Sequence, residues 1–207
     1  MLITLASLVQ DYGLHLTGVV HCGARWGEEA DAYDEQGVRP VWWIEANTEI
    51  IPALHRNVDP RGHHVIEAAL YDVDGAVLPF HVSNFEGQSS SLLPFGTHPE
   101  FSPDTVFLHD ATVTTRTIDS LVAEHGITDC NLINLDLQGV ELRVLRGGVQ
   151  FLQGVNAVYS ECNTAEVYKG CDQLDALDEF LASQGFQRVA IQMNGNQGWG
   201  DALWLRQ

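Results

Sequence analysis

The sequence predicts an α/β fold in which a mostly parallel sheet carries helices on both faces and ends in an antiparallel hairpin. Short apolar runs that are typical of buried strands alternate along the chain with amphipathic segments of helical period, which is the pattern of βαβ units. The last two apolar segments, 186–191 and 202–206, flank a glycine-rich turn, so we expect them to pair as a hairpin. The 207 residues suffice for one domain, 1–207.

Each expected element rests on a local pattern. Helices are predicted where leucines recur with helical spacing, where a threonine can cap the first turn, or where a glycine ends the run. Strands are predicted where about four to eight residues are apolar or alternate with polar ones. In chain order these rules give a helix (3–12), a strand ending at 20, a helix (28–36), a strand (41–45), a helix (48–56, capped by Thr48), strands (64–70, 76–82 and 111–116), a helix (118–125), a strand (131–137), a helix (138–146), a strand (155–160), a helix (174–183) and the final hairpin.

One stretch, 83–110, interrupts this alternation. It holds three consecutive serines, several prolines and two histidines. Four interleaved phenylalanines favour an ordered segment over a disordered spacer. Long segments of this kind inside a compact domain are usually lids or binding loops, so we expect an insertion loop that contacts substrate through Ser89, Ser90 and Ser91.

Charge and cysteine usage narrow the partners and the compartment. The net charge is −18 and the chain has a single lysine, Lys169, whereas nucleic-acid-binding surfaces need clustered basic residues. The four cysteines form no C-x-x-C pair, which is typical of reduced thiols in a cytoplasmic protein. No secretory signal is recognised, and no apolar run approaches the length of a membrane span. We therefore expect a cytoplasmic protein with a small-molecule partner and no nucleic-acid or membrane partner.

A glycine turn follows the first strand in the segment His21-Cys-Gly-Ala-Arg-Trp-Gly-Glu-Glu29. Its two glycines let the backbone approach a ligand at the carboxyl end of a strand. A dinucleotide fingerprint would need glycines where Arg25 and Glu28 stand, and two acids at the helix start would repel a pyrophosphate. An uncharged or cationic nucleoside cofactor fits better, while a plain strand-to-helix turn is the structural alternative.

Acids at three strand ends point to the same rim of the predicted sheet. Glu45 lies about 20 residues beyond the glycine turn, where an acidic side chain typically meets ribose hydroxyls. Asp136 and Glu161 end two later strands. Burying Asp136 is costly unless it meets a ligand, a cation or hydrogen-bond donors. Glycine turn and strand-end acids together predict a nucleoside pocket.

These segments, taken together, resemble the FkbM family of S-adenosylmethionine-dependent methyltransferases. The most specific part is Asp-x-Gln-Gly-x-Glu at 136–141. The matching segments are 21–29, 43–47, 69–75, 88–92, 117–119, 134–142 and 199–203. The resemblance implies a class I methyltransferase (Rossmann-like) fold. It also implies methyl transfer from S-adenosylmethionine, most often to a hydroxyl oxygen of a sugar or other small natural product.

The resemblance also implies which residues meet each ligand. We expect the cofactor to contact His21, Gly23, Ala24, Arg25, Gly27, Glu45, Ala46, Asn47, Ala69, Leu70, Asp136 and Leu137. We expect the acceptor to contact Ser89, Ser90, Ser91, Gln138, Asn163, Tyr168 and Trp199. His21 stands where the family often has Asp, and Gln138 where it often has Glu, so hydrogen bonding must replace charge at both positions.

A hydroxyl acceptor must lose a proton, which requires a base. The catalytic candidates are Asp136, Glu161, Glu141 and His98. A divalent cation held by Asp136, Glu161 and Asn163 is an open alternative, since oxygen ligands suit magnesium. Two other functions also stay open: a binding module that keeps the cofactor fold without turnover, and a dinucleotide-dependent oxidoreductase. The identity of the acceptor and the oligomeric state do not follow from the sequence.

Overall fold

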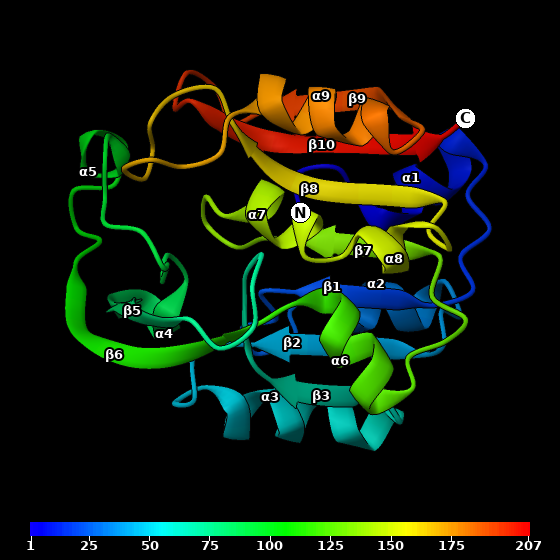
Figure 1. The fold of residues 1–207 in the computed structure, drawn as a ribbon, viewed down its shortest axis with the longest axis horizontal. Coiled ribbons are helices and arrows are strands. Elements are labelled where there is room, and N and C mark those ends of the chain that lie inside the picture. Colours follow the sequence, from blue (N-terminus) through cyan, green and yellow to red (C-terminus); the bar gives the residue numbers. More distant parts are fainter.

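The computed structural model describes all 207 residues and centres on a seven-stranded sheet (Figure 1). The spatial order is β3-β2-β1-β7-β8-β10-β9. Its strands are β1 (Val19–Cys22), β2 (Val41–Glu45), β3 (His64–Glu67), β7 (Leu132–Leu135), β8 (Ala157–Asn163), β9 (Phe186–Met193) and β10 (Trp199–Arg206). The first five pair in parallel, and β10 runs antiparallel to both β8 and β9. This confirms the mostly parallel sheet and the terminal hairpin.

Helices cover both faces of the sheet, as predicted. On one face lie α1 (Leu5–Tyr12), α2 (Ala30–Glu35) and α3 (Ile51–Val58), with a 3-10 turn at Asp59–Arg61. On the other lie α6 (Ile118–His125), α7 (Glu141–Arg146), α8 (Val149–Leu152) and α9 (Leu174–Ser183). Neighbouring strand residues divide between the two cores: Val19 and Leu132 pack with the first set of helices, and Val20 and Ile133 with the second. Strands covered on both faces are continuously apolar, which explains the uninterrupted runs in the sequence.

Threonine side chains cap two of the helices, and a third cap predicted from the sequence is absent. Thr4 and Thr117 cap α1 and α6, each accepting a hydrogen bond of 3.2 Å from a backbone N–H three residues on. Thr48 was expected to cap a helix over 48–56, and this is wrong: α3 begins at Ile51, with Pro52 in its first turn and no side-chain cap. A proline there is tolerated because the first turn needs no hydrogen bond from that N–H. None of the helices is long and apolar enough to cross a membrane.

Two predicted helices begin later than expected, and one predicted strand divides into two. The helices over 28–36 and 138–146 begin at Ala30 and Glu141, because turns occupy the residues after β1 and β7. The strand over 64–70 divides where the N–H of Ala68 donates to the carbonyl of Glu45. Its second part, β4 (Ala69–Leu70), leaves the main sheet and pairs with β6 (Phe107–Arg116), and β5 (Val77–Ser83) completes this second sheet of order β4-β6-β5.

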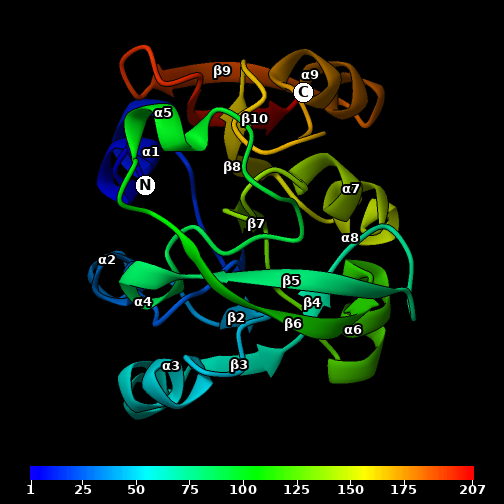
Figure 2. The ribbon, with the colours of Figure 1, turned by 90° about the vertical axis from the view of Figure 1, so that its left-hand side faces the viewer.

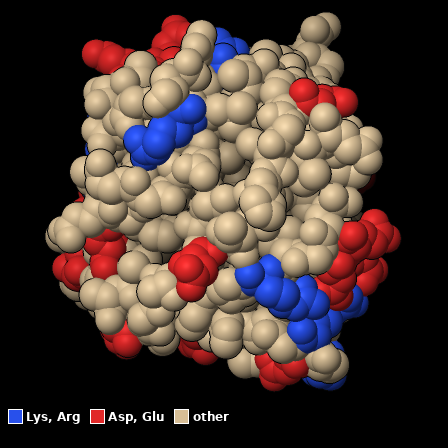
Figure 3. All heavy atoms as spheres, turned by 90° about the vertical axis from the view of Figure 1, so that its right-hand side faces the viewer, with Lys and Arg blue, Asp and Glu red and all other residues tan.

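The expected insertion loop, 83–110, carries more structure than a loop. It contains α4 (Asn84–Gly87) and α5 (His98–Phe101), and its last residues already belong to β6. Together with β5 and β6 it lies at the carboxyl ends of the central strands, on the near side of the molecule in Figure 2. The opposite face carries small groups of basic side chains beside acidic ones and no continuous basic stripe (Figure 3).

Candidate active site

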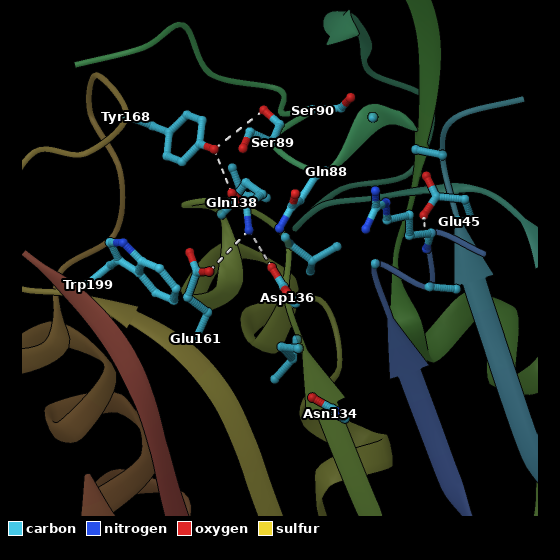
Figure 4. A pocket seen from close by; sticks show the side chains of 18 of the residues that line it. Glu45, Gln88, Ser89, Ser90, Asn134, Asp136, Gln138, Glu161, Tyr168 and Trp199 are labelled. Atoms are coloured by element: carbon cyan, nitrogen blue, oxygen red, sulfur yellow. Dashed lines mark hydrogen bonds between the residues drawn. The ribbon is translucent and has the colours of Figure 1, made fainter. Parts of the chain in front are cut away.

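A cavity of about 620 Å³ lies at the carboxyl ends of β1, β2, β7 and β8 (Figure 4). β1 pairs with β2 on one side and with β7 on the other, although β7 follows much later in the chain. Such a reversal of strand order is where open α/β sheets bind ligands. Residues from the insertion and from the segment after β8 close the cavity on the side away from the sheet.

The glycine turn is held against the neighbouring strands by its backbone. The N–H groups of Gly23 and Ala24 donate to the carbonyl of Ile44 at 2.9 and 3.1 Å. Gly23 has a φ of +85°, and a Cβ at this position would collide with the carbonyl oxygen of Asp136. Only glycine therefore lets the turn after β1 lie directly against the loop after β7. Gly27 serves packing instead, since a Cβ there would lie 2.8 Å from Val58 on α3.

Glu45 ends β2 with its carboxylate buried in the wall of the cavity. Its Oε2 accepts a hydrogen bond of 2.7 Å from the N–H of Arg25, and its Oε1 accepts one of 2.6 Å from the N–H of Asn47. Burial raises the pKa of Glu45 to about 7, while these backbone N–H groups favour the ionised form. The turn after β1 is thus fastened to the end of β2 through one carboxylate.

Gln138 joins two further acids at the other end of the cavity (Figure 4). Its Nε2 donates to a carboxylate oxygen of Asp136 and, at 3.1 Å, to Oε2 of Glu161. Its Oε1 accepts a hydrogen bond of 2.5 Å from the hydroxyl of Tyr168, which fixes the orientation of the amide. Desolvation by the protein around the cavity raises the pKa of Asp136 to about 6, although its side chain is open to the cavity. Burial, and then the charge of Asp136, raise the pKa of Glu161 well above its usual range.

Glu141 holds the loop between β7 and α7 from beneath. It is completely buried, and it accepts hydrogen bonds from the N–H groups of Leu137 at 2.9 Å and Gly139 at 3.1 Å. Its carboxylate does not line the cavity. Glu141 therefore positions the loop that carries Asp136 and Gln138, and it does not face the space where an acceptor would lie.

All but five of the predicted site residues, catalytic candidates included, line the cavity. The five outside its lining are Gly27, Asn47, Ser91, Glu141 and Asn163. Ser91 donates its hydroxyl to the carbonyl of Gln138 at 2.8 Å, and the side chain of Asn47 accepts the N–H of Glu49 at 3.1 Å. Asn163 is buried, and neither atom of its amide has a hydrogen-bond partner. Ser91, Asn47 and Glu141 therefore hold the backbone around the cavity and do not face its interior.

The cavity also holds residues that were not expected there, chiefly Glu29, Phe85, Asn134, Tyr159 and Asp201. Asn134 and Asp201 lie in two of the matching segments, so the resemblance alone offered a signal for them. Tyr159 donates to Asp201 from the neighbouring strand, and this pairing depends on the β8–β10 register, which the sequence does not reveal. No group of three His, Cys, Asp or Glu side chains is placed to hold a metal ion.

Comparison with known proteins identifies the family. The model of the methyltransferase FkbM domain matches residues 21–188. The chain belongs to the FkbM methyltransferase family. Among curated proteins, this FkbM chain is 31% identical over 140 residues to the 2-O-methyltransferase NoeI of Sinorhizobium fredii (strain NBRC 101917 / NGR234). The match covers 65% of the chain and spans 56% of the length of NoeI.

Solved structures establish the fold of this FkbM protein as that of class I methyltransferases. Magnesium protoporphyrin IX methyltransferase (ChlM) from Synechocystis PCC 6803, solved with bound SAM, superposes with a TM-score of 0.55 at 9% identity, covering 98% of this chain and 76% of that one. Sp1610 of Streptococcus pneumoniae, a putative tRNA (m1A22) methyltransferase in complex with S-adenosyl-L-methionine, gives a TM-score of 0.54 at 14% identity, covering 97% and 71%.

S-adenosylmethionine is the cofactor of this family, and the cavity fits it. The buried carboxylate of Glu45 suits ribose hydroxyls, and Ala46, Ala69 and Leu70 line an apolar wall that suits the adenine. The acids that line the cavity outnumber its one arginine, Arg25, and are Glu28, Glu29, Glu45, Asp136, Glu161 and Asp201. This excess of negative charge suits a sulfonium and an ammonium group and disfavours a dinucleotide.

Proposed function

We propose that this protein transfers the methyl group of S-adenosylmethionine to a hydroxyl oxygen of a sugar or similar small natural product. The observation that carries the proposal is the cluster in which Gln138 links Asp136, Glu161 and Tyr168 at the end of the cavity remote from Glu45. Trp199 lines the same end and presents an aromatic side chain to it (Figure 4). Carboxylates, an amide and an indole are groups that bind sugar hydroxyls and sugar ring faces.

Glu161 is the proposed base. Its Oε2 is held by Gln138, whereas its Oε1 accepts no hydrogen bond from the protein and is free to take a proton from an acceptor hydroxyl. The raised pKa of this carboxylate favours proton uptake. His98 is the weaker candidate, because its Nε2 already lies 3.2 Å from the hydroxyl of Ser89 and its Nδ1 is buried.

The protein's own contribution is to bind, orient and exclude water. When bound, the cofactor supplies a methyl group already activated by its sulfonium. The hydroxyl of Tyr168 fixes the orientation of the Gln138 amide. The Nε2 of Gln138 therefore lies between the carboxylates of Asp136 and Glu161 and donates to both. Asp136, at the end of β7, lies between the cofactor side and the acceptor side of the cavity. Ser89 and Ser90 line the wall toward the insertion, where they can bind an acceptor.

The charge of the acceptor end supports an acceptor without phosphate or carboxylate groups. Asp136, Glu161 and Asp201 line it, and Arg25, the single basic side chain of the cavity that is always charged, is paired with Glu28 and donates to the carbonyls of Phe85 and Glu86. No arginine or lysine side chain of the cavity is left unpaired to receive an anionic acceptor. We also propose a cytoplasmic location, which the four buried free cysteines support.

The test is methyl transfer from radiolabelled S-adenosylmethionine to a panel of neutral monosaccharides, methyl glycosides and oligosaccharides, followed by mass spectrometry of the product. We expect a product methylated on oxygen, formed by the wild type and not by Glu161→Gln. Methylation only of a nitrogen or a carbon, or only of nucleic acid or protein, would contradict the proposal.

A further inference from the structure

Glu29 differs from the other carboxylates of the cavity in having no hydrogen bond within the protein. Glu28, Glu45, Asp136, Glu161 and Asp201 each accept at least one. The carboxylate of Glu29 is only 20% exposed, and its neighbours are His21 Nε2 at 3.9 Å and the amino group of Met1 at 3.6 Å. A half-buried carboxylate at a ligand cavity, with no donor of the protein closer than 3.6 Å, is suited to receive a donor from a ligand.

The proton on His21 can be located from its neighbours. The amide Nδ2 of Asn134 donates to the hydroxyl of Tyr33 at 2.9 Å and lies 3.3 Å from His21 Nδ1. The hydroxyl of Tyr33 in turn lies 3.0 Å from the same Nδ1 and donates to it. Nδ1 is therefore an acceptor, and the ring proton is on Nε2, the nitrogen nearest Glu29. Burial lowers the pKa of His21 to about 4, so the ring stays neutral at physiological pH.

This tautomer changes what position 21 can do. A carboxylate at the end of β1 could accept hydrogen bonds from a cationic ligand, but this chain has His21 there. Neutral His21 carries a proton on Nε2 and uses Nδ1 internally, so it has no acceptor to offer the cavity. Glu29 is the residue immediately before α2, and its carboxylate lies 3.9 Å from the same ring. The negative charge missing at position 21 is thus present at position 29.

The location of Glu29 indicates which part of the cofactor it meets. β1 lies between β2 and β7, so the site from Glu45 to Asp136 crosses the end of β1. With the ribose at Glu45 and the adenine against Ala69 and Leu70, the methionine part falls on the side of Glu29 and Asp136. Asp136 already accepts a hydrogen bond from Gln138, whereas Glu29 has only the amino group of Met1 at 3.6 Å, a contact that the ammonium group of a ligand can replace.

We propose that Glu29 binds the α-amino group of the cofactor's methionine part, taking over the charge that His21 lacks. This inference rests on the proposed use of S-adenosylmethionine, and it does not depend on the acceptor.

The test compares two ligands that differ only in the part Glu29 would contact. S-adenosylhomocysteine carries the amino acid, whereas 5′-methylthioadenosine keeps the nucleoside and the thioether sulfur but lacks the amino and carboxyl groups. Both are titrated calorimetrically into the wild type, into Glu29→Gln and into Asp31→Asn. Asp31 lies two residues further on the same helix, exposed and paired with Arg61 at 2.8 Å, so its variant removes one charge outside the cavity.

We expect Glu29→Gln to lower the affinity for S-adenosylhomocysteine about 10- to 100-fold, the contribution of one charge-assisted hydrogen bond. The affinity for 5′-methylthioadenosine should stay within about twofold of the wild-type value. Asp31→Asn should change neither. Equal weakening of both ligands, or of neither, would overturn the role of Glu29 and leave the proposed function standing. Failure of the wild type to bind S-adenosylhomocysteine would overturn both.

Discussion

The two ends of the cavity are built in different ways. At the cofactor end, neighbouring strands and turns are joined by backbone hydrogen bonds. The N–H of Gly23 donates to the carbonyl of Ile44, and the N–H of Asp136 donates to the carbonyl of Cys22 at 3.0 Å. At the acceptor end, side chains join segments far apart in the sequence, as when Tyr168 donates to Gln138. The register of the sheet therefore fixes the cofactor end, whereas individual side chains fix the acceptor end. Substitutions of side chains at the acceptor end should therefore alter the use of the acceptor and leave cofactor binding intact.

The largest expected effect is the loss of kcat in Glu161→Gln, a substitution at the acceptor end. Glu161→Gln keeps the size of the side chain but removes the proposed base, so kcat should fall about 10²- to 10⁴-fold. The affinity for S-adenosylhomocysteine should change by no more than about twofold. Initial rates and calorimetry measure the two quantities, and Glu179→Gln on the exposed side of α9 serves as the matched control. Full activity of Glu161→Gln would assign the base elsewhere, with His98 next to be substituted.

At the cofactor end, Glu45→Ala should weaken S-adenosylhomocysteine about 100-fold or more, because the ribose hydroxyls lose a charged acceptor and two backbone N–H groups lose theirs. Glu49→Ala, an exposed acid paired with His109, is the control. Calorimetric titration with a thermal unfolding curve for each variant distinguishes lost binding from lost structure. Unchanged affinity in folded Glu45→Ala would show that the ribose does not lie at the end of β2.

The pKa of Glu45 also makes cofactor binding depend on pH. Its carboxylate is protonated below about pH 7 in the free protein, and the protonated form accepts ribose hydroxyls less well. The affinity for 5′-methylthioadenosine should therefore fall as the pH is lowered, by up to about tenfold between pH 8 and pH 6. Glu45→Gln should bind more weakly with a flatter profile. Parallel profiles for the wild type and Glu45→Gln would place the titrating group elsewhere.

The smallest expected effect is at Trp199. Trp199→Ala should raise KM for the acceptor about 2- to 10-fold, the value of one aromatic contact, and leave cofactor affinity unchanged. Trp199→Phe should recover most of the loss, since it restores an aromatic face. Steady-state kinetics with the acceptor found in the sugar panel measure both variants. A loss of cofactor affinity in Trp199→Ala would show that the two ends are less separate than their construction suggests.

The difference between the backbone-built cofactor end and the side-chain-built acceptor end explains which parts of the site the sequence could predict. The glycine turn, Glu45 and Asp136 follow strand ends directly, and a parallel sheet brings strand ends to one edge, so their convergence was predictable. The insertion was recognised by its composition, but its contacts depend on long-range pairing, such as the bridge between Phe95 and Tyr168. Glu141 was a candidate base in the sequence, because the sequence does not show that its carboxylate accepts hydrogen bonds from the loop N–H groups.

For Glu29, the sequence predicted which ligand the residue would repel but not which ligand it would bind. Its position at the helix start predicted repulsion of a pyrophosphate, which excludes one class of ligand. The proposed binding of a cationic group by Glu29 depends on the tautomer of His21. That tautomer is fixed by hydrogen bonds with Tyr33 and Asn134, which lie on other elements. Only the folded arrangement supplies this information.

The acid-rich lining of the cavity has a consequence for turnover. Methyl transfer removes the positive charge on sulfur, so the cofactor arrives as a cation at that atom and leaves neutral there. A cavity lined by Glu29, Asp136 and Glu161 attracts the incoming form more strongly than the spent form. The same carboxylates that attract the methyl donor therefore lose one favourable electrostatic interaction when the product forms, which favours release of the product.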